Sequence, residues 1–225
     1  MEMIDNREED ITFNWYNWGP LLCRFHITEK ELEDVKNEIN SDEKNRYDAK
    51  NILAGALKSQ EGFSDYTRYN IFHILSKYFY IYTTHSMLDH AEMIENENFS
   101  MNEMHDKLHC SSMWINHMVA GEYNPLHSHS GEMSFVLYTE LPEGIWSEIE
   151  TTFEESLKRV PPGSIEFRYG TTNRHILKCI TNKIFIPHVG DLFIFPNYLE
   201  HQVYPFQSDG TRVSISGNLS FRDDI

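Results

Sequence analysis

The spacing of apolar residues differs between the two halves of the chain. After Tyr69, apolar side chains recur three and four residues apart, at Ile71, Ile74, Leu75, Tyr78, Phe79 and Tyr82. This spacing predicts a long helix with a wide buried face. Earlier in the chain, Thr28 and Glu31 form the Thr-x-x-Glu pattern of a capping box, which predicts a helix over roughly residues 29–39. The first 110 residues are therefore expected to be mainly helical, apart from a short aromatic stretch that is typical of a strand.

After Cys110 the hydrophobic period changes to two. Short runs with this period are separated by Gly, Pro, Asn or Asp: SSMWINHMVAGEY, EMSFVLYTEL, GSIEFRYG, HILKCITNKIFI, GDLFIFP, HQVYPF and RVSISGNLSF. They predict about seven or eight strands in an antiparallel sandwich or barrel. An acidic insertion at residues 142–162 interrupts the rhythm, and we expect it to form either a short helix or a mobile lid.

Chain length and net charge bear on the number of domains, the partners and the location of the protein. A chain of 225 residues favours one domain, residues 1–225, with a helical support region over 1–110 and a β core over 111–225. With 19 Lys and Arg against 35 Asp and Glu, the net charge of −16 argues against nucleic acid as a partner. No apolar run approaches the roughly 18 residues of a membrane span, and the acidic start does not resemble a signal peptide. We therefore expect a cytoplasmic protein that does not contact a membrane.

The segment GEYNPLHSHSGEMSFVLY contains a candidate metal-binding pair, His127 and His129. At the start of a strand, two residues so spaced project from one face, with Cα atoms about 6.6–7 Å apart. Two imidazoles at this separation can share a metal ion. An isolated His-x-His can equally be two surface histidines. Here, however, the pair follows a Gly-x-x-Asn-Pro turn and precedes an apolar strand, which places it at a strand mouth where barrels bind ligands.

A second group of polar residues lies near the C-terminus. His201 follows the apolar run GDLFIFP, and eleven residues later Arg212 opens a strand in which polar and apolar residues alternate. Arg212 and Ser214 share a face, and together they can hold a carboxylate through a charge-assisted pair of hydrogen bonds and a hydroxyl donor. Asn116 lies in the predicted strand SSMWINHM and Tyr138 in the strand after the histidine pair, where they either pack in the core or contact a cosubstrate.

These motifs resemble those of a known enzyme superfamily. The His-x-His pair, then G-D-L-x-x-F-P-x-x-L-x-H-x-V-x-P and R-x-S-x-S-x-N, are similar to the iron(II)/2-oxoglutarate-dependent oxygenases, and closest to a prolyl-hydroxylase-like branch common in phage and bacterial genomes. The resemblance covers residues 111–221. It implies a mainly β fold, a double-stranded β-helix (a cupin-like jelly-roll barrel) flanked by helices, with Fe(II) and 2-oxoglutarate as cofactors.

The same resemblance implies roles for individual residues. Carried over, His127 is the first iron ligand and His201 the distal one, while Arg212 anchors the distal carboxylate of 2-oxoglutarate with help from Ser214. The chain departs from the family pattern because His129 occupies the position of the usual ligand carboxylate.

Two residues compete for the place of the third ligand. Strand parity favours His129, which shares a face with His127, whereas Glu132 reaches the metal only if the chain turns at Ser130-Gly131. We expect His129 to bind the metal and Glu132 to accept a hydrogen bond from a ligating imidazole.

The resemblance also implies a reaction. We expect a dioxygenase that uses O₂ and 2-oxoglutarate to hydroxylate a C–H bond of a peptidyl side chain or small metabolite, with release of succinate and CO₂. One alternative is a cupin-type metalloenzyme, an isomerase or cofactor-independent dioxygenase, with His127, His129, Glu132 and His201 as ligands. Another is a non-catalytic jelly-roll binding module. The cupin interpretation has no use for Arg212, so the strand that begins there favours the oxygenase.

Overall fold

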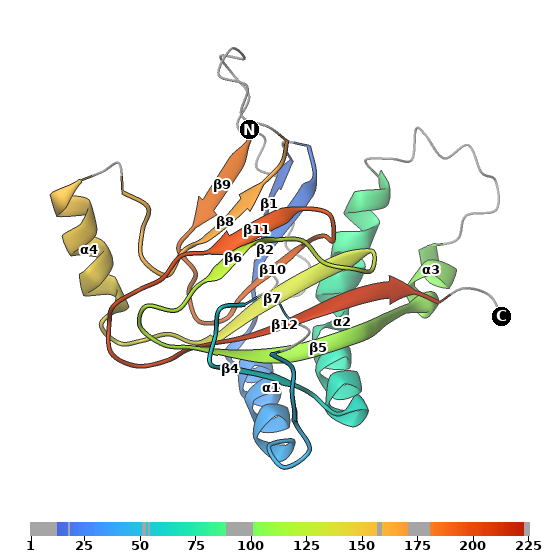
Figure 1. Cartoon of the computed structure of the whole chain (residues 1–225). Coiled ribbons are helices and arrows are strands. Elements are labelled where there is room, and N and C mark those ends of the chain that lie inside the picture. The colour runs from blue at the N-terminus through green and yellow to red at the C-terminus, as the bar shows by residue number, and fades with distance from the viewer. Residues whose placement is uncertain are drawn as a thin grey trace.

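The computed structural model describes most of the chain (Figure 1). The described residues are 13–17, 19–50, 53, 55–88, 101–156, 159–170 and 181–222. The continuation of the long predicted helix beyond Leu88 and the first part of the run HILKCITNKIFI lie outside them.

The helices begin largely where the sequence places them. The capping box is present at α1 (Glu29–Ser41): the Thr28 hydroxyl oxygen accepts a hydrogen bond from the Glu31 N–H, and the Glu31 carboxylate accepts one from the Thr28 N–H. The long helix α2 (Asp65–Leu88) begins before Tyr69, and α3 (Met101–Lys107) follows it. The acidic insertion contains α4 (Ile145–Glu155), so the short helix expected there is present, while its role as a lid stays a prediction. Among the described helices, none is both long and apolar enough to cross a membrane.

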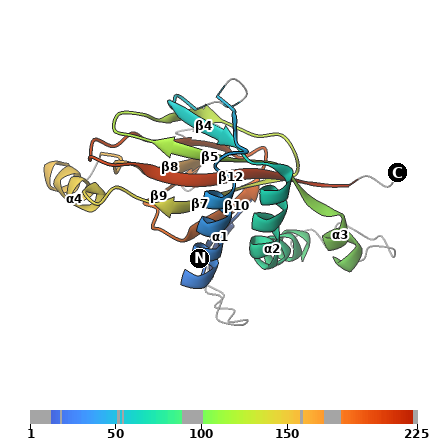
Figure 2. The ribbon, with the colours of Figure 1, turned by 90° about the horizontal axis from the view of Figure 1, so that it is seen from below.

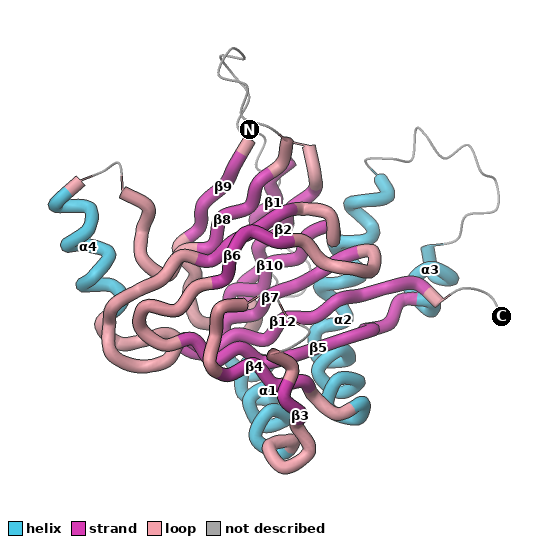
Figure 3. The backbone as a smooth tube through the Cα atoms, in the orientation of Figure 1, coloured by secondary structure: helices cyan, strands magenta, loops and turns pink. Residues whose placement is uncertain are grey.

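The strands form two antiparallel sheets (Figure 3). In spatial order the large sheet contains β1 (Phe13–Asn17), β2 (Leu21–His26), β10 (Asp191–Pro196), β7 (Met133–Glu140), β12 (Arg212–Phe221), β5 (Leu108–Met118), β4 (Ser59–Gly62) and β3 (Tyr47–Asp48). The small sheet contains β6 (Asn124–His127), β11 (Glu200–Val203), β8 (Ile165–Arg168) and β9 (Asn182–Phe185).

From β5 onward the chain passes repeatedly between the two sheets. Strands β5, β7, β10 and β12 belong to the large sheet, and β6, β8, β9 and β11 belong to the small one. This alternation is that of a double-stranded β-helix, so the predicted fold class is confirmed. Over the described residues the two sheets remain separate ladders and do not close into one barrel.

The N-terminal part adds to this jelly roll on two sides of the large sheet. Strands β1 and β2 extend one edge next to β10, and β3 and β4 extend the other edge next to β5. The part before residue 111 therefore supplies strands as well as helices. The division into a support region 1–110 and a catalytic core 111–225 remains a prediction.

Strand alternation separates the interior into two layers. Helices α1 and α2 lie side by side on one face of the large sheet (Figure 2), where Phe79 packs against Phe135. The opposite face looks toward the small sheet, and there Tyr138, Phe167 and Phe193 form a second apolar cluster. Along β12, Val213 and its apolar neighbours point to the helices, so the intervening polar side chains point into the space between the sheets.

Candidate functional site

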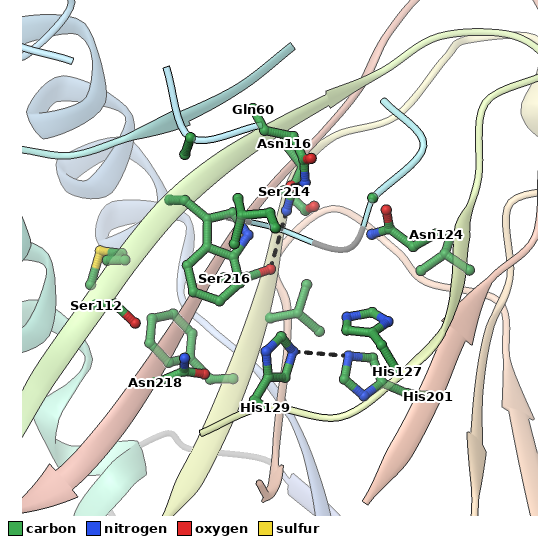
Figure 4. A pocket seen from close by; sticks show the side chains of 18 of the residues that line it. Gln60, Ser112, Asn116, Asn124, His127, His129, His201, Ser214, Ser216 and Asn218 are labelled. Atoms are coloured by element: carbon green, nitrogen blue, oxygen red, sulfur yellow. Dashed lines mark hydrogen bonds between the residues drawn. The ribbon is translucent and has the colours of Figure 1, made fainter. Parts of the chain in front are cut away.

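A cavity of about 360 Å³ lies between the two sheets (Figure 4). Its walls come from β5, β7, β10 and β12 of the large sheet, from β6, β8 and β11 of the small sheet, and from the segment that includes β3 and β4. The cavity is lined by His127, His129, His201, Arg212, Ser214, Asn116 and Tyr138. The fold therefore brings together all of the predicted site residues except Glu132.

Three histidine rings meet at one end of this cavity. His127 at the end of β6 is the direct cross-strand partner of His201 on β11, and their ring centroids are 4.3 Å apart. The Nε2 atoms of His129 and His201 are 3.2 Å apart, and candidate ligand atoms of all three residues lie within 4.8 Å of one another. Two nitrogens bound at right angles to one metal, each at about 2.1 Å, would be about 3.0 Å apart. The spacing of the three rings therefore suits a shared metal ion.

Backbone carbonyl groups set the orientation of two of these rings. His127 Nδ1 lies 2.7 Å from the Pro125 carbonyl oxygen, and His201 Nδ1 lies 3.1 Å from that of Leu199. A carbonyl oxygen only accepts, so each Nδ1 carries the hydrogen and each Nε2 keeps the lone pair that a metal needs.

The surroundings also keep the three imidazoles neutral. Burial lowers the pKa of His201 well below its usual value, with a smaller contribution from the neighbouring His127 and His129. Burial, with help from nearby His127, lowers the pKa of His129 to about 4, and burial also lowers the pKa of His127. Neutral imidazole is the form that binds metal, so the cluster is ready for a metal ion at neutral pH.

His129 reaches the cluster from a loop. His127 ends β6, and residues 128–132 form a loop before β7, so the expectation that both histidines open one strand was wrong. The His129 N–H donates to the Asn197 carbonyl oxygen (3.0 Å), and the Asn197 side chain donates to the carbonyl oxygen of Gly131, whose φ is +94°. The turn before His201 thus fixes the loop that carries His129. Sequence reasoning missed Asn197, whose one signal is its place after Pro196 in that turn.

Glu132 does not join the histidines. Its side chain is exposed and is not part of the cavity wall, and its backbone N–H donates to the Leu219 carbonyl oxygen. The carbonyl oxygens of Pro125 and Leu199 accept the imidazole hydrogen bonds that we expected Glu132 to share. Of the two candidates for the third ligand, only His129 lies in the cluster.

Arg212 lies in the same cavity without an acidic partner. Its side chain is 3% exposed; one terminal nitrogen donates to the Gly163 carbonyl oxygen (3.0 Å), while the buried Nε has no partner. The guanidinium carbon lies 5.2 Å from the centroid of the Tyr138 ring, and the buried Tyr138 hydroxyl is also unpartnered. Burial lowers the pKa of Arg212 and raises that of Tyr138. A buried cation without a counter-ion is costly, so this end of the cavity fits a carboxylate ligand.

Asn116 and Ser214 also line the cavity. They are direct cross-strand partners on β5 and β12, and both are buried. The Asn116 side chain accepts a hydrogen bond from Gln60 Nε2 (2.8 Å) and donates one to Ser216 Oγ (3.3 Å). Gln60, which lies on β4, was missed by sequence reasoning because nothing in its local segment indicates a binding site.

The comparisons with known proteins agree with this arrangement. Residues 112–218 match the family model described as "Putative 2OG-Fe(II) oxygenase". Over these residues the chain is therefore similar to the iron(II)/2-oxoglutarate-dependent oxygenases, whose cofactors are Fe(II) and 2-oxoglutarate, and the predicted resemblance to this superfamily is confirmed. In the comparison with curated proteins, no sequence matches the chain.

Solved structures with a similar arrangement include a prolyl-4-hydroxylase from Pseudomonas putida, which is 11% identical (94% of this chain, 93% of that one, TM-score 0.48). A viral collagen prolyl hydroxylase from Paramecium bursaria Chlorella virus-1, solved with 2-oxoglutarate, is 12% identical (92% and 94%, TM-score 0.47). HygX from Streptomyces hygroscopicus, solved with nickel, 2-oxoglutarate and hygromycin B, is 10% identical (92% and 82%, TM-score 0.47).

The residues of this cavity fit both cofactors of the family. Three neutral imidazoles with converging nitrogens are suitable ligands for Fe(II). The unpartnered nitrogen of buried Arg212 is suited to one carboxylate of 2-oxoglutarate.

Proposed function

We propose that this protein is an Fe(II)- and 2-oxoglutarate-dependent dioxygenase that hydroxylates a C–H bond of a peptidyl side chain or small metabolite. In this proposal His127, His129 and His201 hold Fe(II). Arg212 binds the distal carboxylate of 2-oxoglutarate, assisted by the hydroxyl groups of Tyr138 and Ser214.

The observation that carries the proposal is the buried guanidinium of Arg212, which has no acidic partner and lies in the same cavity as the three histidines. A metal site alone fits many activities. A buried cation beside it calls for an anion that is present during the reaction and absent otherwise. 2-Oxoglutarate meets this requirement because it carries a carboxylate at the end remote from its metal-chelating 2-oxo acid group.

Bound Fe(II) would supply the redox chemistry that couples O₂ to the oxidative decarboxylation of 2-oxoglutarate. In the balanced reaction, one oxygen atom of O₂ enters the new carboxylate of succinate and the other enters the hydroxyl group of the product, while C1 of 2-oxoglutarate leaves as CO₂.

The chain's own residues bind and orient the reactants. The carbonyl groups of Pro125 and Leu199 keep two imidazole Nε2 atoms directed at the metal position. Arg212 fixes which end of 2-oxoglutarate lies away from the metal.

The cupin alternative loses support from the placement of Glu132. Its four-ligand set needs that carboxylate, whereas the exposed Glu132 side chain does not line the cavity. It also leaves the buried charge of Arg212 without a function.

Tryptophan fluorescence tests this proposal directly. The Trp114 ring lies 5.5 Å from the His129 ring, so ligands at the metal should change its emission. We expect 2-oxoglutarate to quench fluorescence in the presence of Fe(II) without O₂, to do so far less without metal, and to lose this effect in Trp114→Phe. Quenching that is independent of metal in the wild type would contradict joint binding at this site.

A further inference from the structure

The cavity holds most of the unpartnered polar atoms found in the interior. Among the described residues, five buried side-chain nitrogen or oxygen atoms have no hydrogen-bond partner, and four of them belong to residues that line this cavity. Two are the donors already described, Arg212 Nε and the Tyr138 hydroxyl. The other two are amide oxygens, Gln60 Oε1 and Asn124 Oδ1. Buried polar groups are almost always hydrogen-bonded, so each pair indicates a ligand.

The two pairs need ligand groups with opposite hydrogen-bonding roles. Donors such as those of Arg212 and Tyr138 suit a carboxylate, whereas the amide oxygens of Gln60 and Asn124 need N–H or O–H groups. At neutral pH 2-oxoglutarate has two carboxylates and a ketone, all of which only accept hydrogen bonds. The cosubstrate therefore satisfies the first pair and leaves the second pair to another molecule.

The two amides face the same space from different sheets. Gln60 is on β4 and is 1% exposed, while Asn124 is on β6, shortly before His127. A methyl group at Gly55 would lie 2.5 Å from Asn124 Oδ1 and 2.7 Å from Gln60 Nε2. Both distances are shorter than a van der Waals contact, so the two amide side chains converge on Gly55, where only glycine fits without displacing them. In Figure 4 the Asn124 side chain lies next to the histidine cluster.

The charge of the lining restricts the ligand further. Apart from the histidines, Arg212 is the only ionisable side chain among the described lining residues that is charged at neutral pH. Once a carboxylate of 2-oxoglutarate neutralises it, neither an anionic nor a cationic group on a second ligand finds a counter-charge in the wall. Burying an unpaired charge there would be costly.

We propose that Gln60 and Asn124 form an acceptor pair that binds an uncharged, hydrogen-donating group of the substrate, such as a carboxamide or a hydroxyl group. This inference rests on the proposed function, because it assigns Arg212 to 2-oxoglutarate. It makes the two amides specificity-determining residues, contributed by β4 and β6.

Two isosteric probes test the acceptor pair. Acetamide donates hydrogen bonds and is neutral, whereas acetate has the same shape, carries a negative charge and only accepts. Binding of each is measured by saturation-transfer NMR on protein loaded with Zn(II) and 2-oxoglutarate. We expect acetamide to bind more tightly than acetate. In Asn124→Leu the affinity for acetamide should fall about 2- to 10-fold, because one hydrogen bond is lost.

An isosteric variant separates an acceptor from a donor role. Asn124→Asp keeps the acceptor oxygens and removes the N–H donors, so it should retain acetamide binding. The exposed helix residue Asn40 supplies matched controls, Asn40→Leu and Asn40→Asp, which should leave the binding of both probes unchanged. Acetate binding as tight as that of acetamide, or unchanged acetamide binding in Asn124→Leu, would overturn the inference.

The failure of this inference can be distinguished from failure of the proposed function. 2-Oxoglutarate is titrated separately into the Zn(II)-loaded wild type by calorimetry. No binding there contradicts the proposed function, while the acetamide comparison, repeated without 2-oxoglutarate, still tests the acceptor pair through the Asn124 variants.

Discussion

The Nε2 atoms of His129 and His201 lie 3.2 Å apart although 72 positions separate the two residues in the chain. One residue comes from the loop after β6 and the other from β11, and the backbone of Asn197 connects the loop to the turn that precedes His201. At this distance two lone pairs that face each other repel unless a proton or a cation lies between them. The spacing of this pair therefore suits two ligands of one metal ion, as the proposed site requires.

The first prediction concerns the identity of the third ligand. His129→Ala and His201→Ala should each weaken Fe(II) binding by more than about 100-fold, because loss of a ligand costs more than loss of an outer hydrogen bond to one. Glu132→Gln should retain Fe(II), since its side chain is exposed and lies outside the cavity wall. Metal content after gel filtration, with circular dichroism to confirm folding, measures both effects.

The opposite pattern would change the assignment. Loss of iron in Glu132→Gln with retention in His129→Ala would mean that the loop rearranges to give a carboxylate ligand. Loss in both variants would favour the four-ligand cupin arrangement.

The second prediction concerns Arg212. Arg212→Gln should weaken 2-oxoglutarate binding by about 30- to 5000-fold, which corresponds to roughly 2–5 kcal/mol for removing a buried charged partner. Fe(II) binding should change little because Arg212 does not belong to the histidine cluster. Calorimetric titration of the metal-loaded protein measures the effect, with the exposed Arg159→Gln as control. Equal affinities in wild type and Arg212→Gln would remove Arg212 from the cosubstrate site.

The third prediction is a pH dependence of stability in the metal-free protein. Burial lowers the pKa of His129 to about 4 from an ordinary value of 6.5, and lowers those of His127 and His201 too. Below about pH 6.5 these histidines bind protons in the unfolded chain but stay neutral in the folded chain. The free energy of unfolding should therefore fall as the pH drops from 6.5 toward 4. The free energy of unfolding, measured with urea at several pH values in this range, should change less steeply with pH in His129→Phe than in the wild type. An identical slope in wild type and variant would show that His129 is protonated in the folded state.

The fourth prediction concerns Asn197, the residue that fixes the His129 loop. Asn197→Ala removes the side-chain hydrogen bond to the Gly131 carbonyl oxygen but keeps the backbone bond from His129. We expect Fe(II) affinity to fall about 2- to 10-fold, the value of one hydrogen bond, with little change in melting temperature. Asn182→Ala, on the edge strand β9, removes a hydrogen bond to Glu166 and is a control that should leave Fe(II) affinity unchanged.

The features that sequence reasoning predicted correctly are those with a local cause. The capping box at Thr28 and Glu31 depends on residues three apart, and the alternation from Arg212 to Asn218 depends on strand periodicity alone. His127, His201 and Arg212 could therefore be named as candidates from their motifs. The fold then brings these residues into one cavity.

The features that sequence reasoning missed depend on contacts between distant segments. The bond between Gln60 and Asn116 joins residues 56 positions apart, and nothing near Gln60 in the chain indicates a binding site. The loop of His129 was predicted as a strand because His-x-His before an apolar run has the right period. The positive φ of Gly131 and the hydrogen bonds of Asn197 decide its shape instead.

The most direct test of the central claim is the conversion of 2-oxoglutarate to succinate. Purified protein is incubated with Fe(II), ascorbate, O₂ and 2-oxoglutarate, alone and with fractions of a cell lysate, and succinate is quantified. The proposed site predicts succinate that requires Fe(II), increases with a fraction containing the substrate, and is lost in His201→Ala and Arg212→Gln. Succinate formation that is equal in wild type and Arg212→Gln, or absent from a wild-type protein that holds Fe(II) under every condition, would contradict the account.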